Sequence, residues 1–143
     1  MKTYFETILE IISSSVESLD ETVFEQLLNE CRQTLLKGGK IIVSGLGKNV
    51  PVCDKFVGTM NSLGLRACFM NTNSAVHGDL GMVMPEDLVI LLTKSGETVE
   101  SVYLASLLKK QKANLWLLSF RSESTLTREI PKKLLLKLEH EGD

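Results

Sequence analysis

The sequence predicts a three-layer α/β domain with a parallel sheet, preceded by two N-terminal helices. From residue 40 onward, apolar runs of strand length alternate with amphipathic segments of about a dozen residues, a pattern typical of βαβ units. The run at residues 89–92 is apolar at every position, as expected of a strand that is covered on both faces. Residues 1–38 show helical periodicity instead, and we therefore expect one domain over residues 1–143.

Two helices are predicted at the N-terminus. Apolar residues recur at helical spacing in residues 5–16 and again in residues 24–36, with a break at residues 18–20. Asp20 is a good N-cap for the second helix, and Gly38-Gly39 is a good stop signal. The first helix has an apolar stripe that a single covered sheet does not need. A homodimer or homotetramer with contacts from this helical hairpin is therefore expected.

The α/β core is predicted over residues 39–143. Its expected strands are residues 41–43, 66–70, 88–92, 115–118 and 134–138. Helices are expected at residues 51–63 and 97–112, a polar loop at residues 71–85, and a loop with a short helix at residues 121–130. The fifth strand is followed by residues 139–143 without a covering helix. We therefore expect that a C-terminal segment of the domain is missing from this chain.

Composition and charge exclude several classes of protein. The 143 residues are 43% hydrophobic and 24% charged, with a formal net charge of -2, one Trp and two Tyr, which argues against a nucleic-acid-binding surface. The apolar runs are of strand length and no signal peptide is recognisable, so we expect no membrane association and a cytoplasmic location. Three widely spaced cysteines form no metal-binding pattern, so free thiols and no metal or cofactor are expected.

The segment after the third predicted strand has the composition of an anion-binding loop. Thr93, Ser95 and Thr98 supply hydroxyls, and Gly96 permits a tight turn before the next helix. Free backbone N–H groups and the helix dipole attract a phosphate at such a position. A polar turn with ordinary N-capping would have the same composition, and the segment alone does not separate the two.

Two further loops carry candidate site residues. Gly45-Leu46-Gly47-Lys48 follows the first strand but fits neither nucleotide-binding motif, because Val50 stands at the third Rossmann glycine and the P-loop spacing is wrong. It leaves Lys48 either as a cation for a substrate oxygen or as a solvated surface lysine. His77 lies in a polar loop with glycines, where it is either a proton-transfer group or structural.

Glu97 and Glu100 are predicted in the first turn of the helix that follows this loop. Side chains three residues apart lie on neighbouring faces of a helix. One of the two could serve as a base and the other as a cap; for Glu97 alone, capping is the favoured interpretation.

Together, the motifs at residues 44–48, 77–82 and 95–100 resemble the sugar isomerase (SIS) domain family, and most closely its arabinose-5-phosphate isomerases. The resemblance runs from about Gly39 to Glu141. It implies a five-stranded parallel sheet of flavodoxin-like order and an oligomer with sites near subunit contacts. It also implies a phosphorylated sugar as substrate and the interconversion of D-arabinose 5-phosphate and D-ribulose 5-phosphate through an enediol.

The resemblance also implies roles for single residues. Glu100 would be the base, Lys48 and His77 would act on the sugar, and Glu141 stands where the family has another functionally relevant glutamate. The substrate and its phosphate would be bound by Ser44, Gly45, Lys48, Thr93, Ser95, Gly96 and Thr98.

The sequence also departs from the family pattern. The family usually has Ser-Gly-His where Asn49-Val50-Pro51 follows the lysine, and Asn71 replaces a histidine that can bind metal, so no zinc is expected there. The tandem CBS domains of many members and the late C-terminal histidine are absent from this chain. A non-catalytic phosphosugar sensor is therefore the alternative to an isomerase. A hexulose phosphate or amino-sugar phosphate is an alternative substrate.

Overall fold

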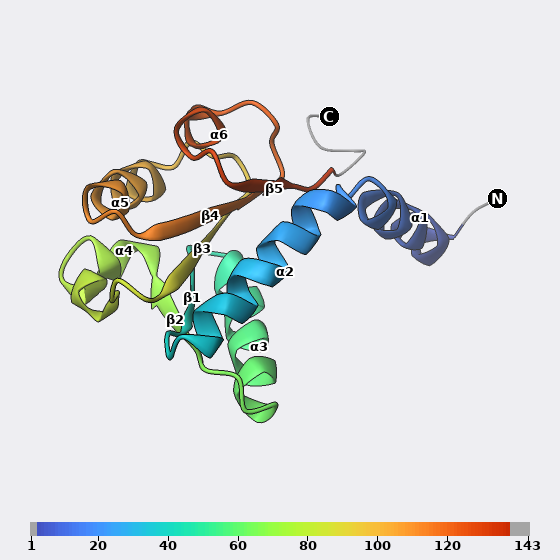
Figure 1. Cartoon of the computed structure of the whole chain (residues 1–143). Helices are drawn as coiled ribbons and strands as arrows, with labels where there is room; N and C mark the ends of the chain where they lie inside the picture. Colours follow the sequence, from blue (N-terminus) through green and yellow to red (C-terminus); the bar gives the residue numbers. More distant parts are fainter. Residues whose placement is uncertain (1–2, 138–143) are drawn as a thin grey trace.

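The computed structural model describes residues 3–137 and contains one five-stranded sheet in the order β2-β1-β3-β4-β5. All four strand pairs are parallel, so the flavodoxin-like order implied by the family resemblance is confirmed. The strands are β1 (Ile41–Gly45), β2 (Ala67–Asn71), β3 (Leu88–Thr93), β4 (Asn114–Ser119) and β5 (Lys133–Leu135). The helices are α1 (Tyr4–Glu17), α2 (Glu21–Leu36), α3 (Asn49–Ser62), α4 (Thr72–Ala75), the 3₁₀ helix η1 (Asp79–Met82), α5 (Val99–Lys110) and α6 (Thr125–Glu129). Figure 1 shows how they surround the sheet.

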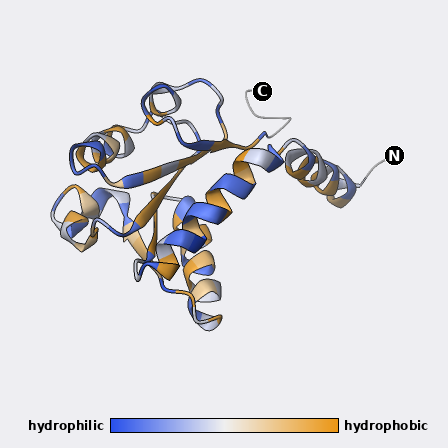
Figure 2. Ribbon diagram, in the orientation of Figure 1, coloured by the Kyte–Doolittle hydropathy of each residue, from blue (hydrophilic) through white to orange (hydrophobic). Residues whose placement is uncertain are grey.

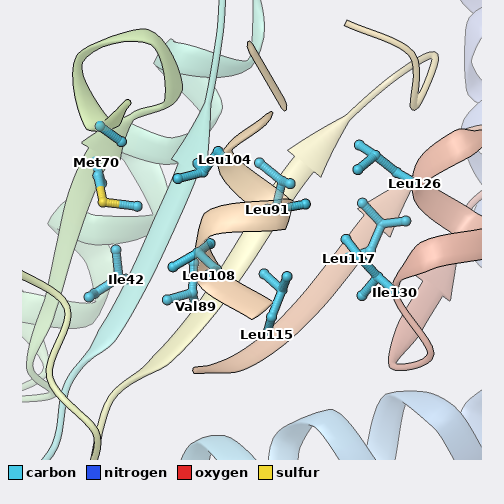
Figure 3. Packing of buried hydrophobic residues seen from close by; sticks show 12 residues of the cluster. Ile42, Met70, Val89, Leu91, Leu104, Leu108, Leu115, Leu117, Leu126 and Ile130 are labelled. Atoms are coloured by element: carbon cyan, nitrogen blue, oxygen red, sulfur yellow. The ribbon is translucent and has the colours of Figure 1, made fainter. Parts of the chain in front are cut away.

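One face of the sheet packs against α4, α5 and α6. Alternate strand residues such as Ile42, Val89 and Leu117 point to this face, where they meet Leu104 and Leu108 of α5. Figure 3 shows these side chains between the strands and the helices. Each residue named here is at most 1% exposed, so this layer is a closed hydrophobic core.

The opposite face packs against α2 and α3. Ile41, Val43 and Trp116 alternate with the residues of the first cluster and pack with Leu27 of α2 and Cys53 of α3. The indole N–H of Trp116 donates to Glu30 at 3.0 Å, so its polar atom is satisfied. The predicted three-layer arrangement follows from this alternation, since each strand supplies side chains to both layers.

The first helix stands apart from these layers. Thr3 caps α1, yet none of the residues of α1 is buried. Residues 18–20 connect the end of α1 to the start of α2, and α1 projects away from the sheet (Figure 1). Figure 2 shows hydrophobic residues along this projecting helix. The two expected N-terminal helices are thus present, and α1 does not lie along α2. No helix in residues 3–137 has both the length and the apolar character needed to cross a membrane.

Several boundaries differ from those predicted. The helix expected to begin at Glu97 begins at Val99, because residues 94–96 form a bend with Gly96 at positive φ and Thr98 is still extended. The polar loop at residues 71–85 contains α4 and η1, which are four residues each and too short to show periodicity. The fifth strand covers residues 133–135, and the residues after 137, Glu141 among them, lie outside the described part of the chain.

Candidate functional site

The candidate site lies where β1 and β3 end side by side. These strands are paired from Ile41↔Leu88 to Ser44↔Leu91, yet α3 follows β1 onto one face and α5 follows β3 onto the other. Connections that leave in opposite directions create a crevice at the carboxyl ends of two neighbouring strands, the usual ligand position in open α/β sheets. The loop at residues 44–48 and the loop at residues 93–98 both begin at this position, which we call the crevice.

The loop after β1 brings the start of α3 close to the end of the strand. The Ser44 hydroxyl is fully buried and forms a hydrogen bond of 2.8 Å with the hydroxyl of Thr72, at the start of α4. A Cβ on Gly45 would lie 2.9 Å from Asn49 Cβ and 3.2 Å from Cys53 Sγ, so only glycine lets α3 begin this close to the strand. Lys48 is exposed and immediately precedes α3.

The loop after β3 is held by its own hydroxyls. Thr93 is buried, and its Oγ1 accepts a hydrogen bond of 2.9 Å from the Gly96 N–H. Ser95 Oγ accepts one of 3.2 Å from the Glu97 N–H. The Thr98 hydroxyl donates to Ser101 Oγ at 2.7 Å. All three predicted hydroxyls therefore lie in this loop and shape it, while each retains capacity for a further hydrogen bond.

Glu97 ties this loop to α6. Its carboxylate accepts hydrogen bonds from the backbone N–H of Thr125 and, at 3.2 Å, from the Thr125 hydroxyl. These two bonds, the backbone one first, lower the pKa of Glu97 below its usual value. The Leu126 N–H also donates to Gly96 O at 3.2 Å. Glu97 was expected to cap its own helix; it lies two residues before α5 and caps α6 instead.

The two helices that begin at the crevice lack side-chain caps. Lys48 precedes α3 and Thr98 precedes α5, and neither side chain accepts a hydrogen bond from the first turn of its helix. The first backbone N–H groups of a helix have no partner within it. The other four α-helices in residues 3–137 are capped by the side chains of Thr3, Asp20, Asn71 and Ser124. At α3, however, the N–H groups of Asn49 and Val50 donate to Leu46 O and Gly47 O, and Pro51 has no N–H. The uncapped N–H groups whose partial positive charge favours an anion therefore lie at the start of α5, after β3.

The remaining predicted residues lie around the same edge of the sheet. Glu100 is the second residue of α5 and is half-buried, while His77 is exposed in the turn after α4. No contact in the described residues joins His77 to Lys48 or Glu100, and their roles stay predictions. Among residues 3–137, no three His, Cys, Asp or Glu side chains gather as the ligands of a metal would. Asn71 caps α4 by accepting from the N–H groups of Asn73 and Ser74.

The comparison with protein families agrees with this geometry. The model of the SIS domain matches residues 34–140, which include both strands of the crevice and every described candidate residue. The chain belongs to the SIS domain family.

Known SIS proteins are similar along most of the chain. Arabinose 5-phosphate isomerase KdsD of Yersinia pestis is 33% identical over 135 residues, covering 94% of this chain and 41% of that protein. The chain thus spans about two fifths of the length of the curated relatives it matches. A structure of c3406 from E. coli CFT073 in complex with arabinose 5-phosphate is 30% identical, with a TM-score of 0.84, over 94% of this chain and 70% of that one. The sugar isomerase domain of an RpiR transcription factor from Sphaerobacter thermophilus, 18% identical, shares the fold with a TM-score of 0.78 over 95% and 76% of the two chains.

The structure of this SIS domain also contains supporting residues that the sequence did not single out. Thr72 bonds Ser44, and Ser124 packs against Gly96 and caps α6. Asn71-Thr72 directly after a strand is a recognisable N-cap signal and could have revealed α4. The contact of Ser124 with Gly96 joins segments far apart in the sequence, so no local pattern indicates it.

Proposed function

We propose that this SIS domain binds a phosphorylated sugar at the crevice and isomerises it between aldose and ketose, with D-arabinose 5-phosphate and D-ribulose 5-phosphate as the pair. The observation that carries this proposal is the uncapped N-terminus of α5, which follows directly on the hydroxyl-rich loop at the end of β3. Family membership and the similarity to KdsD support the choice of reaction.

The phosphate would occupy the N-terminus of α5. The backbone N–H groups of the first turn, together with the hydroxyl of Ser95, offer several donors to one anion. Thr98 would join them if its hydroxyl turned from Ser101 to the phosphate. The loop is already ordered by the bonds of Thr93 and Glu97, so little conformational entropy is lost on binding.

The carbon chain of the sugar would extend from the phosphate toward β1. Isomerisation requires a base to remove the proton next to the carbonyl, and other groups to move protons between the two oxygens of the enediol. Glu100 is our candidate for the base, because it is one residue into the helix that would hold the phosphate. Lys48 and His77 are the candidates for the oxygens, and Glu141, outside the described residues, is a further candidate.

The experiment is an isomerase assay on the full chain. D-ribulose 5-phosphate is supplied and the formation of D-arabinose 5-phosphate is followed by NMR, with the Glu100→Gln variant as the matched control. We expect product with the wild-type chain and about a hundredfold less with the variant, the scale of general-base removal. Binding of the sugar phosphate without turnover by the wild type would contradict the enzymatic proposal.

A sensor is the second candidate, and two observations favour it. Asn49 donates a long hydrogen bond of 3.5 Å to Leu92 O, and Asn71 caps α4. Asn49 opens the segment where the family usually has Ser-Gly-His, and Asn71 stands where it has a histidine that can bind metal. Both side chains thus serve the local backbone here. In the sensor interpretation the chain binds the sugar phosphate and stays inactive, which the same assay combined with calorimetry distinguishes. A hexulose or amino-sugar phosphate tested in parallel covers the other substrates.

A further inference from the structure

The side chain of Asn49 bridges the two strands that form the crevice. Asn49 is the first residue of α3, and its Cβ packs against the end of β1, 2.9 Å from where a Cβ on Gly45 would lie. Its Nδ2 donates to Leu92 O, near the end of β3, at 3.5 Å. β1 and β3 pair as far as Ser44↔Leu91, so the amide meets the next carbonyl of β3 beyond this pairing. The Asn49 amide therefore lies at the floor of the crevice.

The bond to Leu92 determines which atom of the amide is presented to a ligand. A backbone carbonyl oxygen only accepts hydrogen bonds, so Asn49 must turn its Nδ2 toward Leu92 O and its Oδ1 away from it. Within residues 3–137, Oδ1 has no hydrogen-bond partner. No buried side-chain oxygen or nitrogen in these residues lacks a partner, so Oδ1 is open to solvent. The group that Asn49 offers is therefore an acceptor.

The two sides of the crevice offer different chemistry. After β3, the first N–H groups of α5 and the hydroxyl of Ser95 can donate to an anion. After β1, the N–H groups of Asn49 and Val50 already donate to carbonyls of the preceding turn, and the Asn49 oxygen adds an acceptor. Neighbouring strands lie about 4.8 Å apart. A ligand whose phosphate lies at α5 therefore meets Asn49 with the far end of a short carbon chain.

We propose that Asn49 Oδ1 accepts a hydrogen bond from the hydroxyl at the end of a sugar phosphate remote from its phosphate, and that this contact selects a hydroxyl over a carboxylate. In the ketose of the proposed pair, this is the hydroxyl on C1. The inference rests on the proposed binding of a phosphorylated sugar in the crevice, but it does not require turnover.

The selection follows from the fixed amide. A hydroxyl donates its proton to an amide oxygen, whereas a carboxylate has no proton to donate and its charge is repelled by the partial charge of that oxygen. An asparagine without other partners would turn its Nδ2 to the carboxylate. Here that rotation would break the bond to Leu92 O and leave the carbonyl facing an oxygen. Asn49 would thus separate sugar phosphates from aldonic acid phosphates of the same length.

Two ligands that differ only at the first carbon provide the test. D-arabinitol 5-phosphate has a hydroxyl there and 5-phospho-D-arabinonate has a carboxylate, and neither contains the aldehyde or ketone that an isomerase converts. Their dissociation constants are measured by calorimetry with the full wild-type chain and with Asn49→Ala, whose fold circular dichroism verifies. Asn49→Ala should weaken binding of the alditol phosphate about fivefold, the scale of one hydrogen bond. Binding of the carboxylate ligand should stay equal or become tighter, so the ratio of the two constants should change at least about fivefold.

Asn73→Ala is the matched control. Asn73 is exposed in α4 and its side chain has no hydrogen-bond partner in the described part of the chain, so this variant should leave both dissociation constants unchanged. An unchanged ratio in Asn49→Ala would overturn the proposal. An equal loss for both ligands would also overturn it, because such a loss reflects a structural role alone. A wild-type chain that binds neither ligand would refute the proposed phosphosugar site itself, and this proposal with it.

Discussion

Replacement of Gly96 by alanine tests how the candidate phosphate loop is held in place. Gly96 has φ +73°, a conformation that is about 1 kcal/mol less favourable for alanine than for glycine. The new Cβ would lie 2.6 Å from Ser124 Cβ and closer still to its hydroxyl, so Ser124 must move. Ser124 is the N-cap of α6, and losing such a cap destabilises a protein by about 1 kcal/mol. Loss of the bond from the Leu126 N–H to Gly96 O adds about 1 kcal/mol.

We therefore expect Gly96→Ala to lower the free energy of unfolding by about 3 kcal/mol, measured by urea denaturation. Gly38→Ala is the matched control, because Gly38 has φ +90° and no atom within 4 Å of its Cβ position, so its loss should be limited to about 1 kcal/mol. In a Ser124→Gly background the effect of Gly96→Ala should fall to about the same value. Equal losses for Gly96→Ala and Gly38→Ala, or no relief from Ser124→Gly, would refute the reasoning.

Three further predictions concern binding, turnover and pH dependence. Ser95→Ala should weaken sugar-phosphate binding by about 1–3 kcal/mol in calorimetry, since a hydrogen bond to a charged group is lost; unchanged affinity would move the phosphate elsewhere. Glu100→Gln should keep this affinity while turnover falls about a hundredfold, and full activity in that variant would make His77 the next candidate for the base. Burial alone would raise the pKa of Asp87, but hydrogen bonds from the Lys40 ammonium and from the backbone N–H groups of Met84 and Lys40 lower it below its usual value. The stability contributed by this carboxylate should therefore be complete above about pH 4 and decline as the pH falls through the lowered pKa. In Asp87→Asn, the free energy of unfolding should depend less steeply on pH in this acidic range, and an unchanged pH dependence would contradict the prediction.

Much of the fold could be predicted because burial imposes periodicity on the sequence. The run at residues 89–92 is apolar throughout because β3 is central and covered on both faces, and Asp20 is a cap because the first N–H groups of α2 need an acceptor. Hydrophobic periodicity alone does not predict the order of the strands in the sheet. This order came from the family resemblance, since pairing between strands depends on contacts distant in the sequence.

The sequence indicates which residues form the candidate phosphate loop, but not the hydrogen bonds that join this loop to other elements. Thr93, Ser95 and Thr98 do lie together in a loop before a helix, as the hydroxyl-rich composition indicated. The prediction that Glu97 caps the start of α5 is wrong, because its carboxylate accepts a hydrogen bond from the N–H of Thr125 in α6. A carboxylate near the start of one helix gives no local sign that it binds the start of another. α4 is not predicted, because a helix of four residues is too short to show periodicity.

The link between Glu97 and α6 makes two distant segments one cooperative unit. α6 has five residues, too few to be stable as an isolated helix, so its order depends on Leu126 in the core and on the bonds it shares with the loop after β3. Anything that fixes residues 93–98 must also fix the start of α6, and fraying of α6 must loosen the loop. An occupant of the crevice would thus shift the local unfolding equilibrium of a segment almost thirty residues further along the chain. The affinity for that occupant then depends in part on how stably α6 packs against the sheet.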